Sequence, residues 1–558
     1  MTLLSVENLG VAYPTRRGNV QAVTGANLMV EPGQIHGLVG ESGAGKSTLG
    51  AAIMGLIDAP GGITDGRIHL RDQSIGGLDK AAMQALRGAK ISMIFQDPLT
   101  ALNPLLTVGD QIVETIRQHL DLREDEARGK AIALLDRVGI GDADERIDQY
   151  PHQFSGGMRQ RVVIALALCS EPDVIIADEP TTALDVSIQA QILDLVRELA
   201  REQQVGVILI THDMGVIAEI TDVVTVMYRG QVVETGPTAK VLGNPDHDYT
   251  RALISAVPPP NRKMHRFELI SYGGGLPKVN IDELSGGWTA PLSDGPLIVA
   301  QSLTKLFVQK RSLIPSRRRY FTAVDDVSFD IRAGEVFGLV GESGSGKSTI
   351  ARMIAALYSL DGGSVHFDGE AVDRGSSATM LNSYRRQIQM IFQDPFSSLN
   401  PRMRVDAIIA EPLRHLSDLS GDEVTRRVDA LLEGVGLGSA AGRRFPHEFS
   451  GGQRQRISVA RALATRPRFL ICDEPTSALD VSVQAQILNI LKDLQEQLNL
   501  TMLFISHDLP VVRQMCDRVG VLRNGKLVEL ADTETLFEAP QHAYTKELLR
   551  LMPRFRTG

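Results

Sequence analysis

Two glycine-rich segments, Gly40–Ser47 and Gly341–Ser348, share the spacing GxxxxGKS. Each follows a short apolar run and opens a helix-like stretch, which is the context that a phosphate-binding loop requires. Glycines let the backbone curl so that its N–H groups face phosphate oxygens, with help from the helix N-terminus. The alternative, a glycine-rich turn with an exposed lysine, is disfavoured because the pattern occurs twice in the same context.

This pattern predicts two nucleoside triphosphate sites. In each, the lysine reaches the β- and γ-phosphates, and the hydroxyl that follows is placed to ligate Mg²⁺. The phosphate-binding residues predicted here are Gly40, Gly43, Gly45, Lys46, Ser47 and Thr48 in the first copy, and Gly341, Gly344, Gly346, Lys347, Ser348 and Thr349 in the second.

Two acidic pairs end apolar runs: Asp178-Glu179 follows Val174–Ala177, and Asp473-Glu474 follows a similar run. Paired acids are usually solvated surface residues, but a carboxylate at the end of a buried strand is costly without a role. In a phosphate-loop enzyme the first acid holds Mg²⁺ and the second polarises the attacking water. We therefore expect Asp178 and Asp473 to serve the metal, and Glu179 and Glu474 to be catalytic.

The whole set of motifs recurs in the same order about 300 residues later, so the chain is a duplication. Short apolar runs such as Val207–Ile210 alternate with helix-like segments such as Ser187–Glu202, which indicates an α/β fold with parallel strands. The predicted organisation is a first domain at 1–257, an interdomain linker at 258–296 and a second domain at 297–558. Pro258–Pro260, Gly273–Gly275 and the only tryptophan fall in that linker.

Composition sets limits on the class of protein. Hydrophobic residues make up 43% and charged residues 22% of the 558 residues, as in ordinary globular proteins. We find no apolar run long enough to span a bilayer, and no secretory signal is expected. The formal net charge of −9 argues against a broad nucleic-acid surface. The three cysteines form no CxxC pair and are expected to be buried, reduced thiols in a cytosolic protein.

The segments Phe154–Gly157 and Phe449–Gly452, which lie between each glycine loop and its acidic pair, resemble the signature of ATP-binding-cassette (ABC) proteins. The resemblance extends to Q-loops at Gln96 and Gln393, D-loops at 183–185 and 478–480, and H-loop histidines at His212 and His507. It covers nearly all of the chain outside the linker.

The resemblance implies two tandem P-loop NTPase cassettes, each a RecA-like α/β core with a helical subdomain and a β subdomain. It also implies that each ATP lies between the P-loop of one cassette and the signature of the other. Lys46 and Glu179 would then share a site with the second signature, and Lys347 and Glu474 with the first. The site residues added by the resemblance are Ser155, Gly156, Gly157, Ser450, Gly451, Gly452 and Gln453 for ATP, Gln96 and Gln393 for the metal, and His212 and His507 for catalysis.

Two aromatic residues, Tyr13 and Phe307, precede the P-loops where family members stack an aromatic ring on adenine. Core packing is an equal alternative for both, and an insertion separates Phe307 from its P-loop. The signatures differ at one position, where Met158 matches Gln453. We expect modest asymmetry between two working sites.

The tails His247–Leu253 and His542–Leu548, together with Leu102-Asn-Pro104 and Leu399-Asn-Pro401, resemble the oligopeptide/dipeptide/nickel importer family. This implies a motor at the cytoplasmic face of a prokaryotic inner membrane, docked peripherally near Gln96 and Gln393 on two permease subunits. An extracytoplasmic binding protein would deliver the solute; peptides, murein fragments, opines, nickel chelates and sugars all use related motors. The iron–sulfur cysteine cluster of many members is missing.

The alternative is a soluble tandem ABC ATPase acting on ribosomes or nucleic acid. The linker is not the long charged helix of the ribosome-acting proteins, and the cysteines exclude the zinc modules of the DNA-repair type. A basic run, Arg311–Arg319, lies in the insertion of the second domain. Such runs are usually solvated, and contact with anionic lipid headgroups is the functional alternative.

Overall fold

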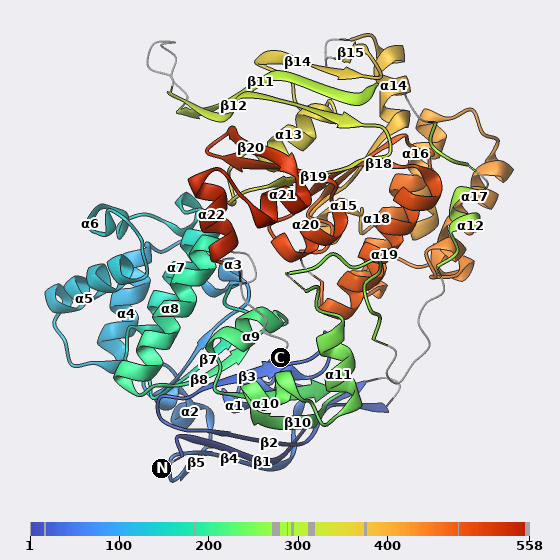
Figure 1. Ribbon diagram of the computed structural model, residues 1–558. Coiled ribbons are helices and arrows are strands. Elements are labelled where there is room, and N and C mark those ends of the chain that lie inside the picture. The colour runs from blue at the N-terminus through green and yellow to red at the C-terminus, as the bar shows by residue number, and fades with distance from the viewer. Residues whose placement is uncertain are drawn as a thin grey trace. The chain divides into compact units, whose positions relative to one another are not determined.

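The computed structural model describes residues 2–552 apart from 16–17, 182–185, 260, 271–278, 287, 292–294, 311–318, 373–375 and 478. These residues form two compact units, one that ends at Val257 and one from Pro258 to Met552. Each unit contains a six-stranded and a four-stranded sheet with helices around them (Figure 1). The predicted fold, two tandem α/β cassettes, is confirmed. Both D-loops and most of the Arg311–Arg319 run lie at least partly outside the described residues.

The six-stranded sheet of unit 1 has the order β10-β9-β3-β8-β7-β6, and all neighbours are parallel except β9 and β10. Every residue of β3, β7 and β8 is buried, as expected of apolar strands covered on both faces. The strands are β3 (Ile35–Val39), β6 (Ile91–Ile94), β7 (Val174–Asp178), β8 (Gly206–Ile210), β9 (Val223–Tyr228) and β10 (Gln231–Pro237).

The second sheet of unit 1 is antiparallel, with the order β2-β1-β4-β5. Its strands are β1 (Leu4–Thr15), β2 (Gly18–Val30), β4 (Gly62–Leu70) and β5 (Gln73–Ser74). Helices α4, α5 and α7 pack on one another as the helical subdomain. The helices of unit 1 are α1 (Lys46–Ile53), α2 (Lys80–Leu86), α3 (Pro98–Ala101), α4 (Val108–His119), α5 (Glu124–Arg137), α6 (Ala143–Arg146), η1 (Pro151–Gln153), α7 (Gly156–Leu168), α8 (Val186–Gln203), α9 (Met214–Ile220), α10 (Thr238–Gly243) and α11 (Asp248–Ser255).

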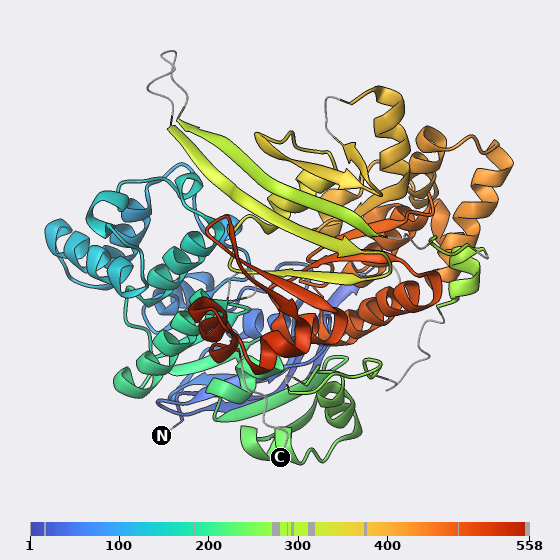
Figure 2. The same cartoon turned by 45° about the horizontal axis from the view of Figure 1, so that its top comes forward.

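Unit 2 repeats both sheets, in the orders β16-β17-β18-β13-β19-β20 and β12-β11-β14-β15. Figure 2 shows β11 and β12 as a long ribbon. The strands are β11 (Pro296–Lys310), β12 (Arg319–Arg332), β13 (Val336–Val340), β14 (Gly362–Phe367), β15 (Glu370–Val372), β16 (Ile388–Ile391), β17 (Phe469–Asp473), β18 (Thr501–Ile505), β19 (Arg518–Arg523) and β20 (Lys526–Asp532). The helices are α12 (Ile281–Ser285), α13 (Lys347–Ile354), α14 (Ala378–Gln387), α15 (Pro395–Ser398), α16 (Val405–Leu416), α17 (Gly421–Gly434), η3 (Ser439–Arg443), η4 (Pro446–Glu448), α18 (Gly451–Leu463), α19 (Val481–Leu498), α20 (Leu509–Met515), α21 (Thr533–Glu538) and α22 (Ala543–Arg550).

The described residues of 258–290, which we call the strap, pack on the rest of unit 2. Phe267, Ile281 and Leu284 are buried in the same apolar cluster as the helices of that unit. The amide of Asn489 on α19 both accepts from the Phe267 N–H at 3.0 Å and donates to its carbonyl at 2.9 Å. Lys492 donates to the carbonyls of Met264 and His265. The strap is therefore held by apolar burial and by paired backbone groups.

The strap also reaches the helical subdomain of unit 2. Helix α12 lies beside α17 (Figure 1), and the Asn280 N–H donates to the carbonyl of Gly434 at 2.9 Å. Gly434 has no room for a side chain, because a Cβ there would lie 2.5 Å from Leu284. One short segment thus touches both the core helix α19 and the helical subdomain.

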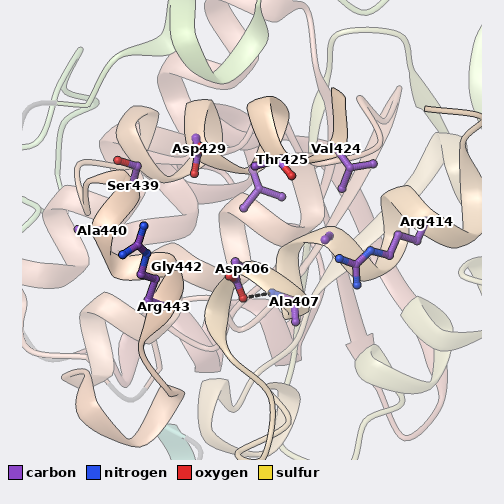
Figure 3. Close-up of a pocket in the computed structure, with 12 residues that line it drawn as sticks. Asp406, Ala407, Arg414, Val424, Thr425, Asp429, Ser439, Ala440, Gly442 and Arg443 are labelled. Carbon is purple, nitrogen blue, oxygen red and sulfur yellow. Dashed lines mark hydrogen bonds between the residues drawn. The ribbon is translucent and has the colours of Figure 1, made fainter. Parts of the chain in front are cut away.

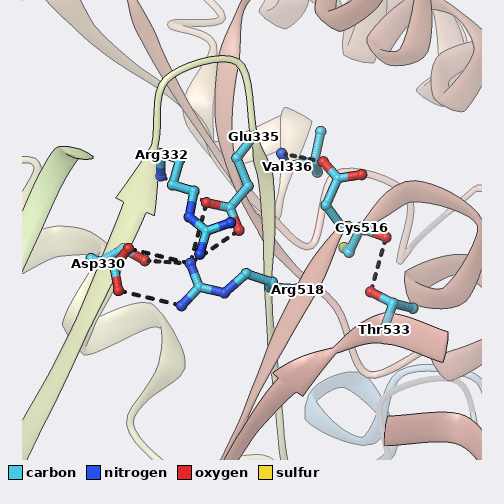
Figure 4. Close-up of polar contacts among 8 residues, drawn as sticks. Asp330, Arg332, Glu335, Val336, Cys516, Arg518 and Thr533 are labelled. Atoms are coloured by element: carbon cyan, nitrogen blue, oxygen red, sulfur yellow. Dashed lines mark hydrogen bonds and ion pairs between the residues drawn. The ribbon is translucent and has the colours of Figure 1, made fainter. Parts of the chain in front are cut away.

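An ion cluster joins the two sheets of unit 2 (Figure 4). Arg518 of β19 lies 3.3 Å from carboxylate oxygens of Asp330 on β12 and of Glu335 just before β13. Burial raises the pKa of Glu335, although the N–H of Arg332 and the charge of Arg518 act to lower it. Since Glu335 is only 7% exposed, this arginine stabilises a carboxylate that has little access to water.

Among the described residues no helix is long and apolar enough to cross a membrane. The three cysteines are free and buried, as predicted, and burial raises the pKa of Cys169 to about 12. Such thiols are poor nucleophiles near neutral pH.

Candidate functional site

In each unit the predicted P-loop, glutamine, acidic pair and histidine lie at the carboxyl ends of adjacent parallel strands. In unit 1 the P-loop follows β3, Gln96 follows β6, Glu179 follows β7 and His212 follows β8. Unit 2 places its counterparts after β13, β16, β17 and β18. Ligands of open parallel sheets bind at this edge, so the topology gathers residues that are far apart in the sequence.

The glycines of the P-loops are required by the backbone. Gly40 has φ +149°, and a Cβ there would lie 2.2 Å from the carbonyl oxygen of Met227. Gly341 has φ +150°, and a Cβ there would lie 2.2 Å from the carbonyl oxygen of Leu522. Gly45 and Gly346 also have positive φ and directly precede α1 and α13. Each loop therefore leads directly into the N-terminus of a helix, as the motif requires.

Each P-loop lysine is buried beneath its own loop. Lys46 is 7% exposed and donates to the carbonyls of Gly40 and Glu41 at 2.8 and 3.0 Å. Lys347 donates to Gly341 and Glu342 at 2.7 and 2.8 Å. The ammonium groups are thus held inside the curl of the loop, where a phosphate would meet them.

The P-loop serine of each unit is joined to the first acid of the acidic pair. Ser47 Oγ donates to Asp178 Oδ1 at 3.1 Å, and Ser348 Oγ donates to Asp473 Oδ1 at 2.9 Å. Burial raises the pKa of both aspartates, against the hydrogen bonds from the serines, which lower it. A buried carboxylate with a raised pKa gains from a nearby cation.

The second acid of each pair is the centre of a three-residue contact. Gln96 Nε2 donates to Glu179 Oε2 at 2.8 Å, and His212 Nδ1 lies 3.1 Å from Glu179 Oε1. In unit 2, Gln393 Nε2 donates to Glu474 Oε2 at 2.8 Å, and His507 Nδ1 lies 3.3 Å from the same oxygen. The structure therefore brings the predicted glutamine, glutamate and histidine together in both copies.

Electrostatics favour an ion pair at these contacts. Burial acts to lower the pKa of His212 and His507, but the hydrogen bond and charge of the neighbouring glutamate outweigh it and raise both. Burial acts to raise the pKa of Glu474, but His507, Lys347 and Gln393 together outweigh it and lower the pKa. Glu474 is thus kept ionised, and each histidine binds a proton more readily than a free imidazole does.

Both glutamates adopt a left-handed backbone with φ +49°, which is uncommon for a residue with a side chain. Their N–H groups donate to the carbonyls of Ile210 and Ile505 on the next strand. Such strain persists where the surroundings determine the conformation, and it clusters at functional sites. The sequence carried no sign of this feature.

The signature serines cap helices. Ser155 and Ser450 are the N-caps of α7 and α18, which places the Gly-Gly pairs in the first helical turn. In unit 2 the Gln453 side chain also accepts from the Ser450 N–H at 3.1 Å and completes a capping box. Met158 cannot accept in this way, and its sulfur instead lies 3.6 Å from Arg146. The two signatures thus differ in their helix caps, and the modest asymmetry between the two sites stays a prediction.

The two predicted adenine-stacking aromatics differ in their surroundings. Tyr13 is half-buried against the apolar cluster of unit 1, and its ring fills the space where a Cβ of Gly61 would lie. Phe307 is 36% exposed, packs edge-on against Tyr358 and lies 5.8 Å from the ammonium of Lys305. Tyr13 thus has the packing role that was its alternative interpretation, and stacking stays a prediction for both.

Sequence reasoning missed one pair of contacts to the P-loop. The hydroxyl of Tyr249 accepts from the Glu41 N–H at 3.2 Å, and that of Tyr544 accepts from the Glu342 N–H at 3.2 Å. Both tyrosines are buried and come from the tail helices α11 and α22. The repeated His-x-Tyr-Thr sequence of the tails was the available signal.

Comparison with known proteins identifies the families that the chain resembles. The family described as ABC transporter matches residues 23–182 and 324–477, and the family described as Oligopeptide/dipeptide transporter, C-terminal region, matches 233–287 and 528–558. The chain is 45% identical to the glutathione import ATP-binding protein GsiA of Escherichia coli (strain K12), over 99% of this chain and 89% of that one. The protein of the same name from Shigella flexneri gives the same values. The dimeric structure of MJ0796, a bacterial ABC transporter cassette, is 28% identical and covers 42% of this chain and 98% of its own, with a TM-score of 0.39.

Proposed function

The chain belongs to the ABC transporter family, and from that premise we propose that it drives uptake of a peptide or peptide-like solute. It is an ATP-binding, ATP-hydrolysing protein with two cassettes. The observation that carries the proposal is the presence of a full set of site residues in both cassettes, each followed by the C-terminal region of oligopeptide/dipeptide transporters. The named relatives import glutathione, itself a small peptide.

The donor sets beside the two P-loops fit Mg²⁺. Mg²⁺ prefers oxygen ligands, and each site holds a serine hydroxyl within 3.1 Å of an aspartate oxygen. We assign Ser47, Asp178 and Gln96 to the metal in unit 1, and Ser348, Asp473 and Gln393 in unit 2. Bound there, the ion would neutralise charge on the phosphates.

The residues around the second acid position the water and the γ-phosphate. Glu179 and Glu474 are oriented by their glutamine and histidine neighbours, so each carboxylate can accept hydrogen bonds from the attacking water. His212 and His507, whose pKa values are raised by the neighbouring glutamates, are assigned to the γ-phosphate. The signature serines and their Gly-Gly pairs offer N–H groups at a helix start, which suits the phosphate of the opposite cassette.

Partner binding is assigned to the surface that follows each Q-loop. In unit 2 the chain runs from Gln393 through α15, where Phe396 is 61% exposed, into α16. Helices α16 and α17 and the turn η3 line a cavity of about 530 Å³ (Figure 3). Asp406, Arg414, Asp429 and Arg443 offer charges of both signs around it. A short helix from a permease subunit suits this mixed apolar and charged lining.

In the proposed assembly, two permease subunits dock near Gln96 and Gln393 at the cytoplasmic face of a prokaryotic inner membrane. An extracytoplasmic binding protein delivers the solute. ATP binding closes the cassettes and hydrolysis reopens them, and Gln96 and Gln393 connect this motion to the permeases because each touches the catalytic glutamate of its own unit.

The experiment is to copurify the chain with its permeases and binding protein, reconstitute the complex in vesicles and measure ATPase activity. We expect stimulation by a binding protein loaded with peptide. Cosedimentation with ribosomes, together with ribosome-stimulated ATPase activity, would instead favour the soluble alternative. Asp429→Arg in the cavity should weaken permease copurification, whereas the exposed control Asp422→Arg on the same helix should not.

A further inference from the structure

The two units place a charged pair at the same point of the fold. In unit 1, Lys130 of α5 lies 2.5 Å from Glu171, which follows α7 and has φ +56°. The pair links a helix of the helical subdomain to the start of the core strand β7. It is an ordinary surface ion pair of opposite charges.

Unit 2 has two cations at these positions. Arg427 occupies the matching place on α17, and Arg466 follows α18 with φ +57°. Their guanidinium groups converge beside Gly286. A Cβ atom added at Gly286 would lie 3.0 Å from Arg466 Nη2 and 3.6 Å from Arg427 Nη1. Within the part of the chain that the structure describes, neither arginine forms an ion pair with a carboxylate.

A neighbouring pair of positions carries opposite charges in both units. Arg71 and Asp173 lie 2.9 Å apart in unit 1, and the matching residues of unit 2, Asp368 and Arg468, lie 2.7 Å apart. The signs are exchanged, yet the pair remains. The loss of the acid opposite Arg427 therefore stands out against its immediate surroundings.

Arg427 carries an electrostatic cost at this place. Its Nε is buried and has no hydrogen-bond partner among the described residues, and Nη2 reaches only the carbonyl of Leu463, at 3.4 Å. Burial lowers the pKa of Arg427 to about 10, and the charge of Arg466 acts in the same direction. A half-buried cation beside a second cation calls for a counter-ion.

We propose that Arg427 and Arg466 form a binding site for a phosphate-type oxyanion. Guanidinium groups match phosphate with paired hydrogen bonds, and a phosphate monoester carries close to two negative charges at neutral pH. Two arginines facing one point supply the complementary charge, whereas a carboxylate would neutralise only one of them.

The site is separate from the ATP site of its own unit. Arg466 lies three residues before β17 begins, at the amino end of that strand, whereas the P-loop and Glu474 lie at carboxyl ends of strands. Helix α12 ends with its C-cap Gly286 beside the two arginines, but a five-residue helix offers too weak a dipole to neutralise two cations. The anion is thus expected to join α17, α18 and the strap.

The test compares the full chain with Arg466→Glu, which restores the pattern of unit 1. Thermal unfolding is followed while inorganic phosphate replaces chloride at constant ionic strength. We expect phosphate to raise the unfolding temperature of unit 2 in the natural chain. Arg466→Glu should be more stable without phosphate and should lose the part of this increment that exceeds the P-loop contribution. The P-loops also bind phosphate, but their contribution is the same in both chains.

If phosphate raises the unfolding temperature equally in the two chains, the proposed site is wrong. Arg466→Gln serves as a second variant if the glutamate disturbs folding, and it should also lose the increment. The matched change in unit 1, Glu171→Arg, brings two cations together and should create a phosphate response there.

A second arm identifies the source of the phosphate. Flotation with vesicles of phosphatidic acid, whose headgroup is a phosphate monoester, and phosphatidylcholine is compared with flotation on pure phosphatidylcholine. If Arg466→Glu weakens binding to the anionic vesicles and leaves binding to pure phosphatidylcholine unchanged, the ligand is a lipid headgroup. If vesicle binding is unchanged while the phosphate increment is lost, the ligand is a free phosphate compound. If Arg466→Glu changes neither the vesicle binding nor the phosphate increment, the proposal is overturned.

Discussion

Glu179 and Glu474 have the same left-handed backbone, the same glutamine donor and a histidine beside them. This repetition argues for a chemical role that both cassettes keep. The bulk of each side chain is buried, so the orientation of the carboxylate is set by its neighbours and not by solvent.

If these carboxylates polarise the attacking water, Glu179→Gln with Glu474→Gln should lower ATP turnover by at least about 100-fold. ATP should still bind, because the amide keeps the size of the side chain. The measurements are steady-state ATPase activity and titration with a fluorescent nucleotide. Glu145→Gln, an exposed change, is the control. A loss of ATP affinity equal to the loss of turnover would show that these acids have a structural role.

Lys492 offers a pH-dependent test of the strap. Burial lowers the pKa of Lys492 to about 8, and the nearby Lys263 and Arg266 act in the same direction. The unfolded chain then binds more protons than the folded chain between about pH 8 and the ordinary lysine pKa, so the contribution of this residue to stability rises with pH in that window.

The expected gain is at most about 3 kcal/mol, since one pKa unit corresponds to about 1.4 kcal/mol. Denaturant unfolding of the natural chain and of Lys492→Met, measured from pH 7.5 to 10.5, checks this. The stability of the natural chain relative to the variant should increase with pH. A constant difference would mean that Lys492 is solvated in the folded protein.

At the scale of elements, the tail helices α11 and α22 support the P-loops. Because the hydroxyl of each tyrosine accepts from a P-loop N–H, Tyr249→Phe and Tyr544→Phe leave that N–H without this partner, at a cost of about 1–3 kcal/mol if no water replaces it. We expect a higher KM for ATP with a smaller effect on kcat. The neighbouring Tyr228→Phe, whose ring lies 4.4 Å from that of Tyr249, is the control. Unchanged kinetics would make the contact purely a packing feature.

The strap is the element with the clearest stability prediction. Phe267 is 3% exposed in the cluster of unit 2, so Phe267→Ala should destabilise that unit by about 3–5 kcal/mol. Calorimetry should show the transition of unit 2 shifting down while that of unit 1 stays in place. Glu268→Ala, an exposed neighbour, should change neither. A joint shift of both transitions would show that the units do not unfold independently.

The sequence was informative where function depends on local spacing. The P-loops, the acidic pairs and the capped signatures are each encoded within a few residues, and the order of buried strands then brings Gln96, Glu179 and His212 together. The contacts that the sequence did not predict join residues that lie far apart along the chain. Phe267 and Asn489 are 222 residues apart, and nothing near residue 267 signals that contact. Tyr249 reaches a loop 208 residues away.

At the scale of the whole molecule, both halves keep a complete set of motifs, and we propose that one chain forms a two-site motor. Each P-loop would use the signature of the other cassette. Starting from Lys347→Ala, which silences the second P-loop, Ser450→Ala should then reduce the remaining ATPase activity by up to about 100-fold through lost contacts to the γ-phosphate. Ser155→Ala is the matched control and should have little effect.

If activity falls with Ser155→Ala and survives Ser450→Ala, the exchange of signatures is wrong. Should the single-site chain lose all turnover, cysteines introduced near Lys46 and near Ser450 can be crosslinked under trapped ATP. Crosslinking that depends on ATP supports the exchange, and its absence contradicts it.

The strap has a consequence for how the protein is made. A ribosome releases Phe267 well before it releases Asn489, its partner 222 residues later. At 5–20 residues per second, the interval is roughly 10–45 s. Throughout that time Phe267 lacks the part of α19 that holds it, although the first cassette is already complete. Newly made chains are therefore most exposed to proteases and to aggregation at this segment, and a chaperone that binds apolar peptides would find its target there.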